Sequence, residues 1–186
     1  MNTPLSSSFV PDRTIVLIGM MGAGKSSVGR KLASRLSVPF IDSDDEIEAA
    51  AGMSINRFFE EYGEDEFRKG ERRVISRLLE GPKRVLATGG GAFTDQETRA
   101  LIKSKAISIW LKADINILLT RATRRDDRPL LRGGDPREIM LRLLDERAPL
   151  YAEADITVES VDGPMSETVD RVIKALSSFT NAPKMT

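Results

Sequence analysis

The sequence predicts an α/β fold with a central parallel sheet, and three observations support this class. Short β-branched apolar runs alternate with longer segments of helical periodicity, which is the pattern of strands joined by crossover helices. The first run, at 14–18, leads into a glycine-rich turn and then a helical segment at 25–36. No internal repeat or low-complexity block divides the 186 residues, so we expect one domain.

The same patterns place the elements. We expect five strands, at about 14–18, 39–41, 84–88, 106–111 and 155–158. We expect helices at about 25–36, 44–80 with a break at Gly63, 95–103, from 114 onward, 136–153 and 166–179. The single domain is predicted to span 13–179, between an N-terminal tail at 1–12 and a C-terminal tail at 180–186.

The composition excludes several kinds of chemistry. The chain has no cysteine and no histidine, so disulfides, thiolate metal sites and histidine bases are excluded. The 28 basic and 28 acidic residues balance, which argues against a broad nucleic-acid surface. No apolar run reaches the roughly 20 residues that span a bilayer. We therefore expect a cytoplasmic protein that acts through carboxylates, lysine, arginine, hydroxyls, backbone amides and bound metal ions.

A phosphate-binding loop is predicted directly after the first strand. Residues 19–26 match Gly-x-x-x-x-Gly-Lys-Ser, and glycines let the backbone amides and the following helix N-terminus surround phosphates. Lys25 would reach the β- and γ-phosphates, and the Ser26 hydroxyl would coordinate magnesium. The nucleotide-binding residues are predicted to be Gly22, Ala23, Gly24, Lys25, Ser26 and Ser27. A glycine-rich turn without function is the alternative, and the strand and helix around the motif argue against it.

The loop predicts nucleotide binding without defining the reaction. Loops of this kind occur in GTPases, motors and small-molecule kinases. The guanine signature Asn-Lys-x-Asp is absent, and the chain is short for a motor. Of these three classes, a small-molecule kinase fits the sequence best.

Two carboxylates follow the second strand. Asp42 and Asp44 stand where ligands bind in parallel sheets, whereas the third strand ends at 88–91 without an acidic residue. One carboxylate could hold magnesium through water, and the other could accept a proton from a substrate hydroxyl. The structural alternative is that Ser43 or Asp44 caps a helix that starts near Asp45.

Glycines and arginines supply further candidate residues. The run 89–91 allows a ligand to approach the backbone closely, or it is simply a flexible turn. The charged stretch at about 123–134 predicts a mobile loop, on which Arg128 could stabilise a phosphoryl group in transfer or belong to a solvated charge cluster. Arg68 and Arg147 fall on predicted helices, where surface or ion-pair roles remain open.

Six motifs, in this order and spacing, resemble the shikimate kinase family from about Thr14 to Ser178. They are Gly19-Met20-Met21-Gly22-Ala23-Gly24-Lys25-Ser26, Asp42-Ser43-Asp44, Phe67-Arg68, Thr88-Gly89-Gly90-Gly91, Arg128-Pro129-Leu130-Leu131 and Glu146-Arg147-Ala148-Pro149-Leu150-Tyr151. The resemblance implies a three-layer P-loop kinase fold like that of nucleoside monophosphate kinases. Such a fold has five parallel strands flanked by helices, substrate-binding helices at about 44–80 and a mobile lid at about 123–134.

The resemblance also implies a reaction and its residues. The γ-phosphoryl of ATP would pass to the 3-hydroxyl of shikimate, giving shikimate 3-phosphate and ADP in aromatic amino acid (chorismate) biosynthesis. The implied catalytic residues are Asp44 as base, Lys25 and the lid residue Arg128. The implied shikimate-binding residues are Asp44, Arg68, Gly89, Gly90, Gly91 and Arg147. Arg121, Arg128 and Pro164 would contact the nucleotide, and Ser26 and Asp42 would hold Mg²⁺. The implied partners are ATP and shikimate, bound by a monomer.

Two other functions compete with this interpretation. A related kinase of a small metabolite, such as gluconate, would share the phosphate loop and the lid. It would have no need of two arginines set for a ring carboxylate beside Asp44. A nucleotide-gated binding module without catalysis is the third possibility, and the presence of both Asp44 and Arg128 argues against it.

Overall fold

A five-stranded parallel sheet forms the centre of the protein in the computed structural model, which describes residues 11–124, 131 and 133–182. The strand order is β2-β3-β1-β4-β5, and every neighbouring pair is parallel. The strands are β1 (Thr14–Ile18), β2 (Phe40–Asp42), β3 (Val85–Ala87), β4 (Ala106–Lys112) and β5 (Ile156–Glu159). The predicted fold class is confirmed, and each strand lies within about one residue of its predicted place.

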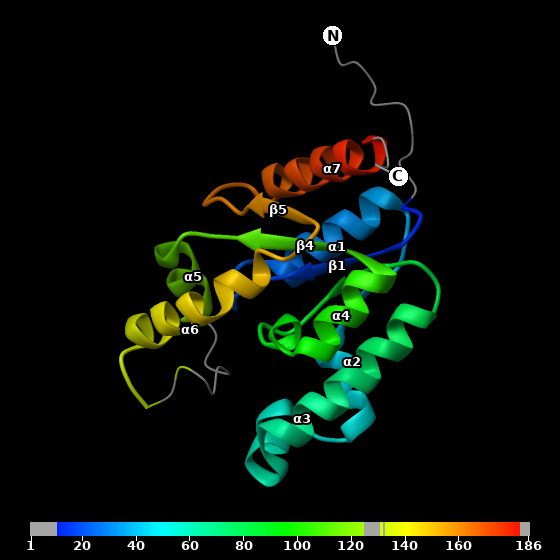
Figure 1. Cartoon of the computed structure of the whole chain (residues 1–186). Coiled ribbons are helices and arrows are strands. Elements are labelled where there is room, and N and C mark those ends of the chain that lie inside the picture. Colours follow the sequence, from blue (N-terminus) through cyan, green and yellow to red (C-terminus); the bar gives the residue numbers. More distant parts are fainter. Residues whose placement is uncertain (1–10, 125–130, 132, 183–186) are drawn as a thin grey trace.

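Helices cover both faces of this sheet and complete the three layers (Figure 1). They are α1 (Lys25–Leu36), α2 (Ser43–Ala51), α3 (Ile55–Glu80), η1 (Ala92–Thr94), α4 (Gln96–Lys105), α5 (Ile115–Ala122), α6 (Pro136–Tyr151) and α7 (Met165–Asn181). The break predicted in the long helix is confirmed, because Gly63 within α3 has a left-handed φ of 80°. Of the predicted lid at 123–134, residues 125–130 and 132 lie outside the described residues.

Several helix boundaries differ by a few residues from the sequence prediction, and two of these differences have a clear physical reason. Helix α7 continues to Asn181, into the predicted tail, because Phe179 packs on the core and the Thr180 hydroxyl donates to the Leu176 carbonyl. Helix α2 begins at Ser43, and its cap is Asp42 rather than Ser43 or Asp44. Asp42 keeps extended backbone at the end of β2 and accepts a hydrogen bond from the Asp44 amide at 3.0 Å.

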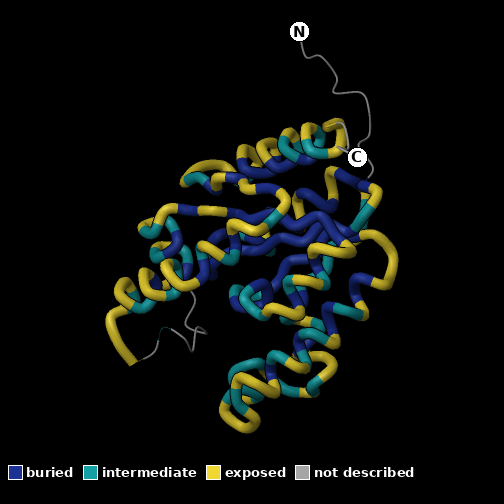
Figure 2. The backbone as a smooth tube through the Cα atoms, in the orientation of Figure 1, coloured by how far each residue is buried: buried dark blue, intermediate teal, exposed yellow. Residues whose placement is uncertain are grey.

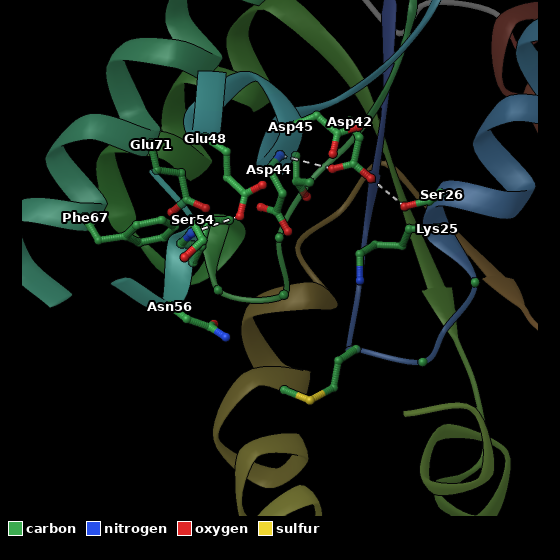
Figure 3. Close-up of a pocket in the computed structure, with 18 of the residues that line it drawn as sticks. Lys25, Ser26, Asp42, Asp44, Asp45, Glu48, Ser54, Asn56, Phe67 and Glu71 are labelled. Atoms are coloured by element: carbon green, nitrogen blue, oxygen red, sulfur yellow. Dashed lines mark hydrogen bonds between the residues drawn. The ribbon is translucent and has the colours of Figure 1, made fainter. Parts of the chain in front are cut away.

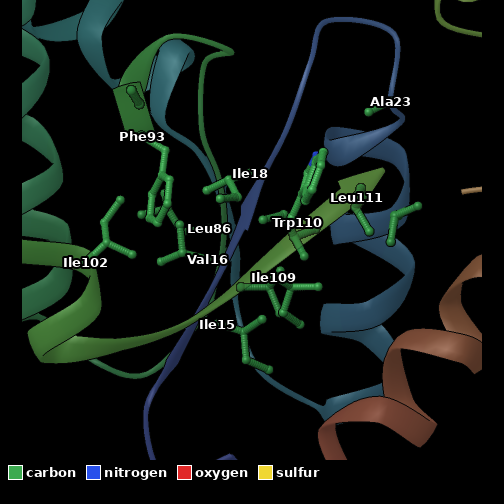
Figure 4. Packing of buried hydrophobic residues seen from close by; sticks show 14 of the residues in the cluster. Ile15, Val16, Ile18, Ala23, Leu86, Phe93, Ile102, Ile109, Trp110 and Leu111 are labelled. Atoms are coloured by element: carbon green, nitrogen blue, oxygen red, sulfur yellow. The ribbon is translucent and has the colours of Figure 1, made fainter. Parts of the chain in front are cut away.

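The buried core lies on both sides of the sheet. In Figure 4, Val16 and Leu86 lie on the same side as Phe93 and Ile102 of η1 and α4, whereas Ile15 lies on the side of α1 and α7. The alternation of Ile15 and Val16 follows from the two-residue period of a strand. Strands β1 and β3 and most of β4 are buried, while α2 and the first half of α3 are mostly half-buried or exposed (Figure 2). Within the described ranges, no helix combines the length and the apolar character needed to cross a membrane.

Helix α1 approaches strand β2 closely at Gly29. A Cβ at this position would lie 2.5 Å from the Phe40 ring and 3.3 Å from Leu17. We expect Gly29→Ala to lower the free energy of unfolding by about 1–3 kcal/mol through overpacking, as measured by urea denaturation. Gly70→Ala is the control, because nothing lies within 4 Å of its Cβ in α3, and alanine there should stabilise by roughly 0.5–1 kcal/mol. Equal effects of the two substitutions would contradict this packing.

Candidate active site

The phosphate loop, residues 19–26, connects β1 to α1 at the carboxyl edge of the sheet. Gly22 has a φ of 82°, and a Cβ there would lie 2.5 Å from the Leu118 carbonyl of α5. Only glycine fits both the left-handed backbone and this close approach. The Lys25 Nζ donates to the carbonyls of Gly19 at 2.8 Å and Met20 at 2.9 Å. The lysine head therefore lies over the loop that the sequence predicts to hold phosphates.

A cleft of about 830 Å³ opens beside this loop and extends to α3 and α6. Figure 3 shows its acidic side, where side chains of β2, α2 and α3 face Lys25. The cleft brings together most of the predicted site residues, namely Gly22, Gly24, Lys25, Ser26, Ser27, Asp42, Asp44, Arg68, Gly89, Gly90, Gly91, Arg121 and Arg147. Sequence segments up to about 125 positions apart thus form one site, as expected where parallel strands end together.

The Ser26 hydroxyl and the Asp42 carboxylate lie next to each other in this cleft. Their oxygens are 2.5 Å apart and joined by a hydrogen bond (Figure 3). One comes from the first turn of α1 and the other from the end of β2. Both are hard oxygen donors of the kind that Mg²⁺ prefers. These two residues therefore have the chemistry that would suit a magnesium ion.

Asp44 lies in the first turn of α2, between Lys25 and Glu71 in the view of Figure 3. Its Oδ1 is 3.0 Å from the place that a Cβ of Gly89 would occupy. Any larger residue at position 89 would push this carboxylate away. The first glycine of the triple run thus makes room for Asp44 at the floor of the cleft.

Two arginines enter the cleft from opposite helices. Arg68 of α3 donates from Nη1 to Glu71 at 2.6 Å and from Nη2 to Glu64 at 3.2 Å. Arg147 of α6 is only 9% exposed, and its Nη1 is buried without a hydrogen-bond partner among the described residues. A buried guanidinium nitrogen without a partner is costly, so this end of the cleft has the charge and the unused donor that would suit an anion.

Glu71 is a site residue that the sequence reasoning missed. It is fully buried, and its Oε1 has no hydrogen-bond partner within the described part of the chain. Burial raises the pKa of Glu71 to about 7, although the Arg68 guanidinium lowers it and Asp44 raises it further. The available signal was its position three residues after Arg68, which places both on one helix face.

The raised pKa of Glu71 predicts a pH-dependent stability. Between its unfolded value near 4.5 and about 7, the folded protein keeps a proton that the unfolded chain has released. Stability therefore falls as pH rises through this window, by up to roughly 1.4 kcal/mol per pH unit. Glu71→Gln should remove this fall, so wild type should lose stability relative to the variant in urea denaturation from pH 5 to 7.

Glu64→Gln is the matched control, because Glu64 is the exposed partner of the same arginine, with 65% of its side chain accessible. Its stability should follow the wild-type pH curve. Parallel curves for wild type and Glu71→Gln at every pH would contradict a protonated Glu71 in the folded state.

Other predicted residues lie at or beyond the nucleotide end of the cleft. Arg121 of α5 donates to the Val161 carbonyl at 2.8 Å and to the Ser160 hydroxyl at 3.2 Å. Ala23 belongs to the phosphate loop but is fully buried, and unlike Gly22 and Gly24 it does not line the cleft. Pro164 precedes α7 as its cap, and the next residue, Met165, lines the cleft in its place. Arg128 lies outside the described residues.

The family model of shikimate kinase matches residues 21–177 of the chain. Curated shikimate kinases are similar over nearly the whole length. The one from Paramagnetospirillum magneticum is 57% identical over 172 residues, covering 92% of this chain and 88% of the relative. The one from Rhodopseudomonas palustris is 58% identical over 168 residues, covering 90% and 83%.

Solved structures agree with these relatives. Shikimate kinase from Acinetobacter baumannii in complex with shikimate has a TM-score of 0.87 and 39% identity, covering 92% of this chain and 96% of that one. A gluconokinase from Sinorhizobium meliloti has a TM-score of 0.62 and 18% identity, covering 94% and 99%, and shows a shared fold alone. The model match and the identities above 50% lead to one conclusion: the chain belongs to the shikimate kinase family.

Proposed function

We propose that the protein transfers the γ-phosphoryl group of ATP to the 3-hydroxyl of shikimate, giving shikimate 3-phosphate and ADP. This reaction belongs to chorismate and aromatic amino acid biosynthesis. One observation carries the proposal. The cleft joins a phosphate loop to a pair of arginines from α3 and α6, with the Asp44 carboxylate between them. The arrangement suits a small acceptor that has both a carboxylate and hydroxyls.

Arg68 and Arg147 bind the carboxylate of shikimate. A guanidinium matches a planar carboxylate with two parallel N–H donors, and the unpartnered Nη1 of Arg147 supplies one such donor. The buried Glu71 holds Arg68 through a 2.6 Å contact and limits its rotation. Gly89, Gly90 and Gly91 line the wall beside the ring. The acceptor is thereby oriented before any bond changes.

Asp44 orients the 3-hydroxyl and accepts its proton. As this oxygen attacks the γ-phosphorus, the bond from that phosphorus to the β–γ bridging oxygen breaks, and ADP leaves with the electron pair. Little further covalent chemistry is needed, because phosphoryl transfer depends mainly on alignment and charge stabilisation. A carboxylate held at the floor of the cleft meets both requirements.

The nucleotide end supplies the charge stabilisation. Amides of residues 22–27 surround the phosphates, Lys25 moves from its loop carbonyls to the transferring group, and Arg128 approaches from a lid at about 123–134. Arg121 lies beside adenine, together with the chain around Pro164. Ser26 and Asp42 hold Mg²⁺, which neutralises phosphate charge when it is bound.

A coupled assay of ADP release from MgATP tests the reaction, with shikimate, gluconate or no acceptor. We expect release only with shikimate. Release with gluconate alone would retain a P-loop kinase and reject the acceptor site described above. No release with either acceptor, despite measured ATP binding, would favour a nucleotide-gated module without catalysis.

A further inference from the structure

We infer that two buried hydroxyls, those of Ser160 and Tyr151, aim backbone amides of the two ligand-binding loops into the cleft. Ser160 would position the Gly24 amide of the phosphate loop, and Tyr151 would position the Gly91 amide of the triple-glycine run. Both are positioning residues, since neither belongs to the residues that line the cleft. The inference rests on the proposed function for the identity of the two ligands, a nucleoside phosphate and shikimate.

Ser160 follows β5 directly and holds the phosphate loop from behind. It is 4% exposed, and its hydroxyl donates to the Ala23 carbonyl at 3.0 Å. The same hydroxyl accepts from Arg121 at 3.2 Å, while the Ser160 amide donates to the Lys112 carbonyl at 2.7 Å. The serine is thus fixed to the end of β4 and leaves the Ala23 carbonyl little freedom to turn.

The peptide unit transmits this restraint to the ligand side. All described peptide bonds are trans, and in a trans peptide the carbonyl and the next N–H point in opposite directions. When the Ala23 carbonyl points to Ser160 beneath the loop, the Gly24 N–H of the same peptide points away from Ser160. Gly24 lines the cleft, so its amide faces the predicted phosphate position.

Tyr151 repeats the arrangement on the acceptor side. It is fully buried at the last turn of α6, one turn after Arg147, and its hydroxyl donates to the Gly90 carbonyl at 2.5 Å. Its ring packs on Trp110 with 5.7 Å between the centroids, which holds the hydroxyl in place. By the same peptide geometry, the Gly91 N–H points away from Tyr151, and Gly91 lines the cleft.

Both amides are available for a ligand. Across the described residues, no acceptor is recorded for the N–H of Gly24 or Gly91, whereas neighbouring amides are used: Ala23 donates to Met20, and Ala92 donates to Gly89. Amides without a protein partner at the edge of a cleft suit anions and hydroxyl oxygens. The two hydroxyls therefore prepare the donors of two different loops for two different ligands.

Because each hydroxyl holds a different loop, we expect each substitution to weaken mainly the binding of one of the two ligands. Ser160→Ala should weaken MgADP binding by about 5-fold, the effect of one poorly aligned hydrogen bond, because only the longer 3.5 Å contact from Arg121 then holds the Ala23 carbonyl. Shikimate binding should stay within about 2-fold. Tyr151→Phe should weaken shikimate binding by a similar factor. Its hydroxyl also contacts the Met20 sulfur of the phosphate loop at 3.8 Å, a weak contact whose loss should change MgADP affinity by less than about 2-fold. Calorimetric titration of each ligand into each variant measures both.

Two further variants separate positioning from general loss of structure. Ser108→Ala removes another fully buried hydroxyl, which bonds to Asp155 at 2.8 Å away from both loops. It should lower the melting temperature without changing either affinity. Ser160→Thr keeps the hydroxyl and should restore MgADP binding to within about 2-fold of wild type. The ratio of ADP affinity to AMP affinity should fall in Ser160→Ala alone, because the inference places the Gly24 amide against the β-phosphate, which AMP lacks.

The outcomes also distinguish this inference from the proposed function. If wild type binds MgADP but not shikimate, the proposed acceptor is wrong. The ADP and AMP affinities of Ser160→Ala then still show whether Ser160 positions the Gly24 amide. If wild type binds both ligands and each variant binds both as wild type does, the anchoring inference is overturned. Equal weakening of both ligands in both variants would also reject it, in favour of a general structural role.

Discussion

Asp44→Asn is expected to lower kcat for shikimate phosphorylation by roughly 10²–10⁴-fold, the range for loss of a general base. Asparagine keeps the size and one oxygen of aspartate, so it still fits beside Gly89, but it cannot accept the proton of the 3-hydroxyl. MgADP affinity should stay within about 2-fold, because Ser26 and Asp42 are not changed. The measurements are steady-state turnover and calorimetric MgADP binding.

Glu46→Gln supplies the matched control on the same helix. Glu46 lies two residues further along α2, and its carboxylate bonds to Arg77 at 2.8 Å instead of facing the cleft. Its turnover should equal that of wild type. Turnover of Asp44→Asn near the wild-type rate would remove Asp44 as the base. Loss of MgADP binding together with turnover would mean that Asp44 supports the site structure instead.

The fold could be predicted because its signals are local. A strand pattern at 14–18, the phosphate-loop motif and helical spacing at 25–36 lie within about 25 consecutive residues, and each agrees with the others. The alternative that Ser43 or Asp44 caps α2 is wrong for an equally local reason. Asp42 caps the helix and also contacts Ser26, and a sequence pattern does not show which of several neighbouring polar groups accepts the amide.

The parts of the site that escaped prediction depend on contacts between distant segments. Tyr151 bonds to a carbonyl 61 residues away, and Ser160 to one 137 residues away. Their partners are backbone atoms, which leave no mark on the sequence. The charge state of Glu71 depends on complete burial beside Arg68, and burial is a property of the packed molecule. Helical spacing alone left the role of Arg147 open for the same reason, and only the resemblance to the family assigned it to the cleft that it lines.

Arg68→Ala is expected to weaken shikimate binding by roughly 10²-fold, because it removes the guanidinium that would donate charge-assisted hydrogen bonds to the shikimate carboxylate. It also removes the guanidinium that lowers the pKa of Glu71, so repulsion of the bound anion adds to the loss only where this buried carboxyl is still ionised. The apparent affinity for ATP should change little. Arg72→Ala is the control on the same helix, because Arg72 bonds to Asp95 and Glu97 and should bind shikimate as wild type does.

The double variant Arg68→Ala/Glu71→Gln separates the two parts of this loss. If repulsion by the uncompensated Glu71 matters, neutral glutamine should recover part of the shikimate affinity that Arg68→Ala alone loses. The recovery should be larger at pH 8 than at pH 6, because Arg68 lowers the pKa of Glu71, and without this guanidinium the carboxyl ionises only at higher pH. No recovery at either pH would assign the whole effect to the lost guanidinium. A change confined to the apparent ATP affinity in Arg68→Ala would mean that this arginine does not bind the acceptor.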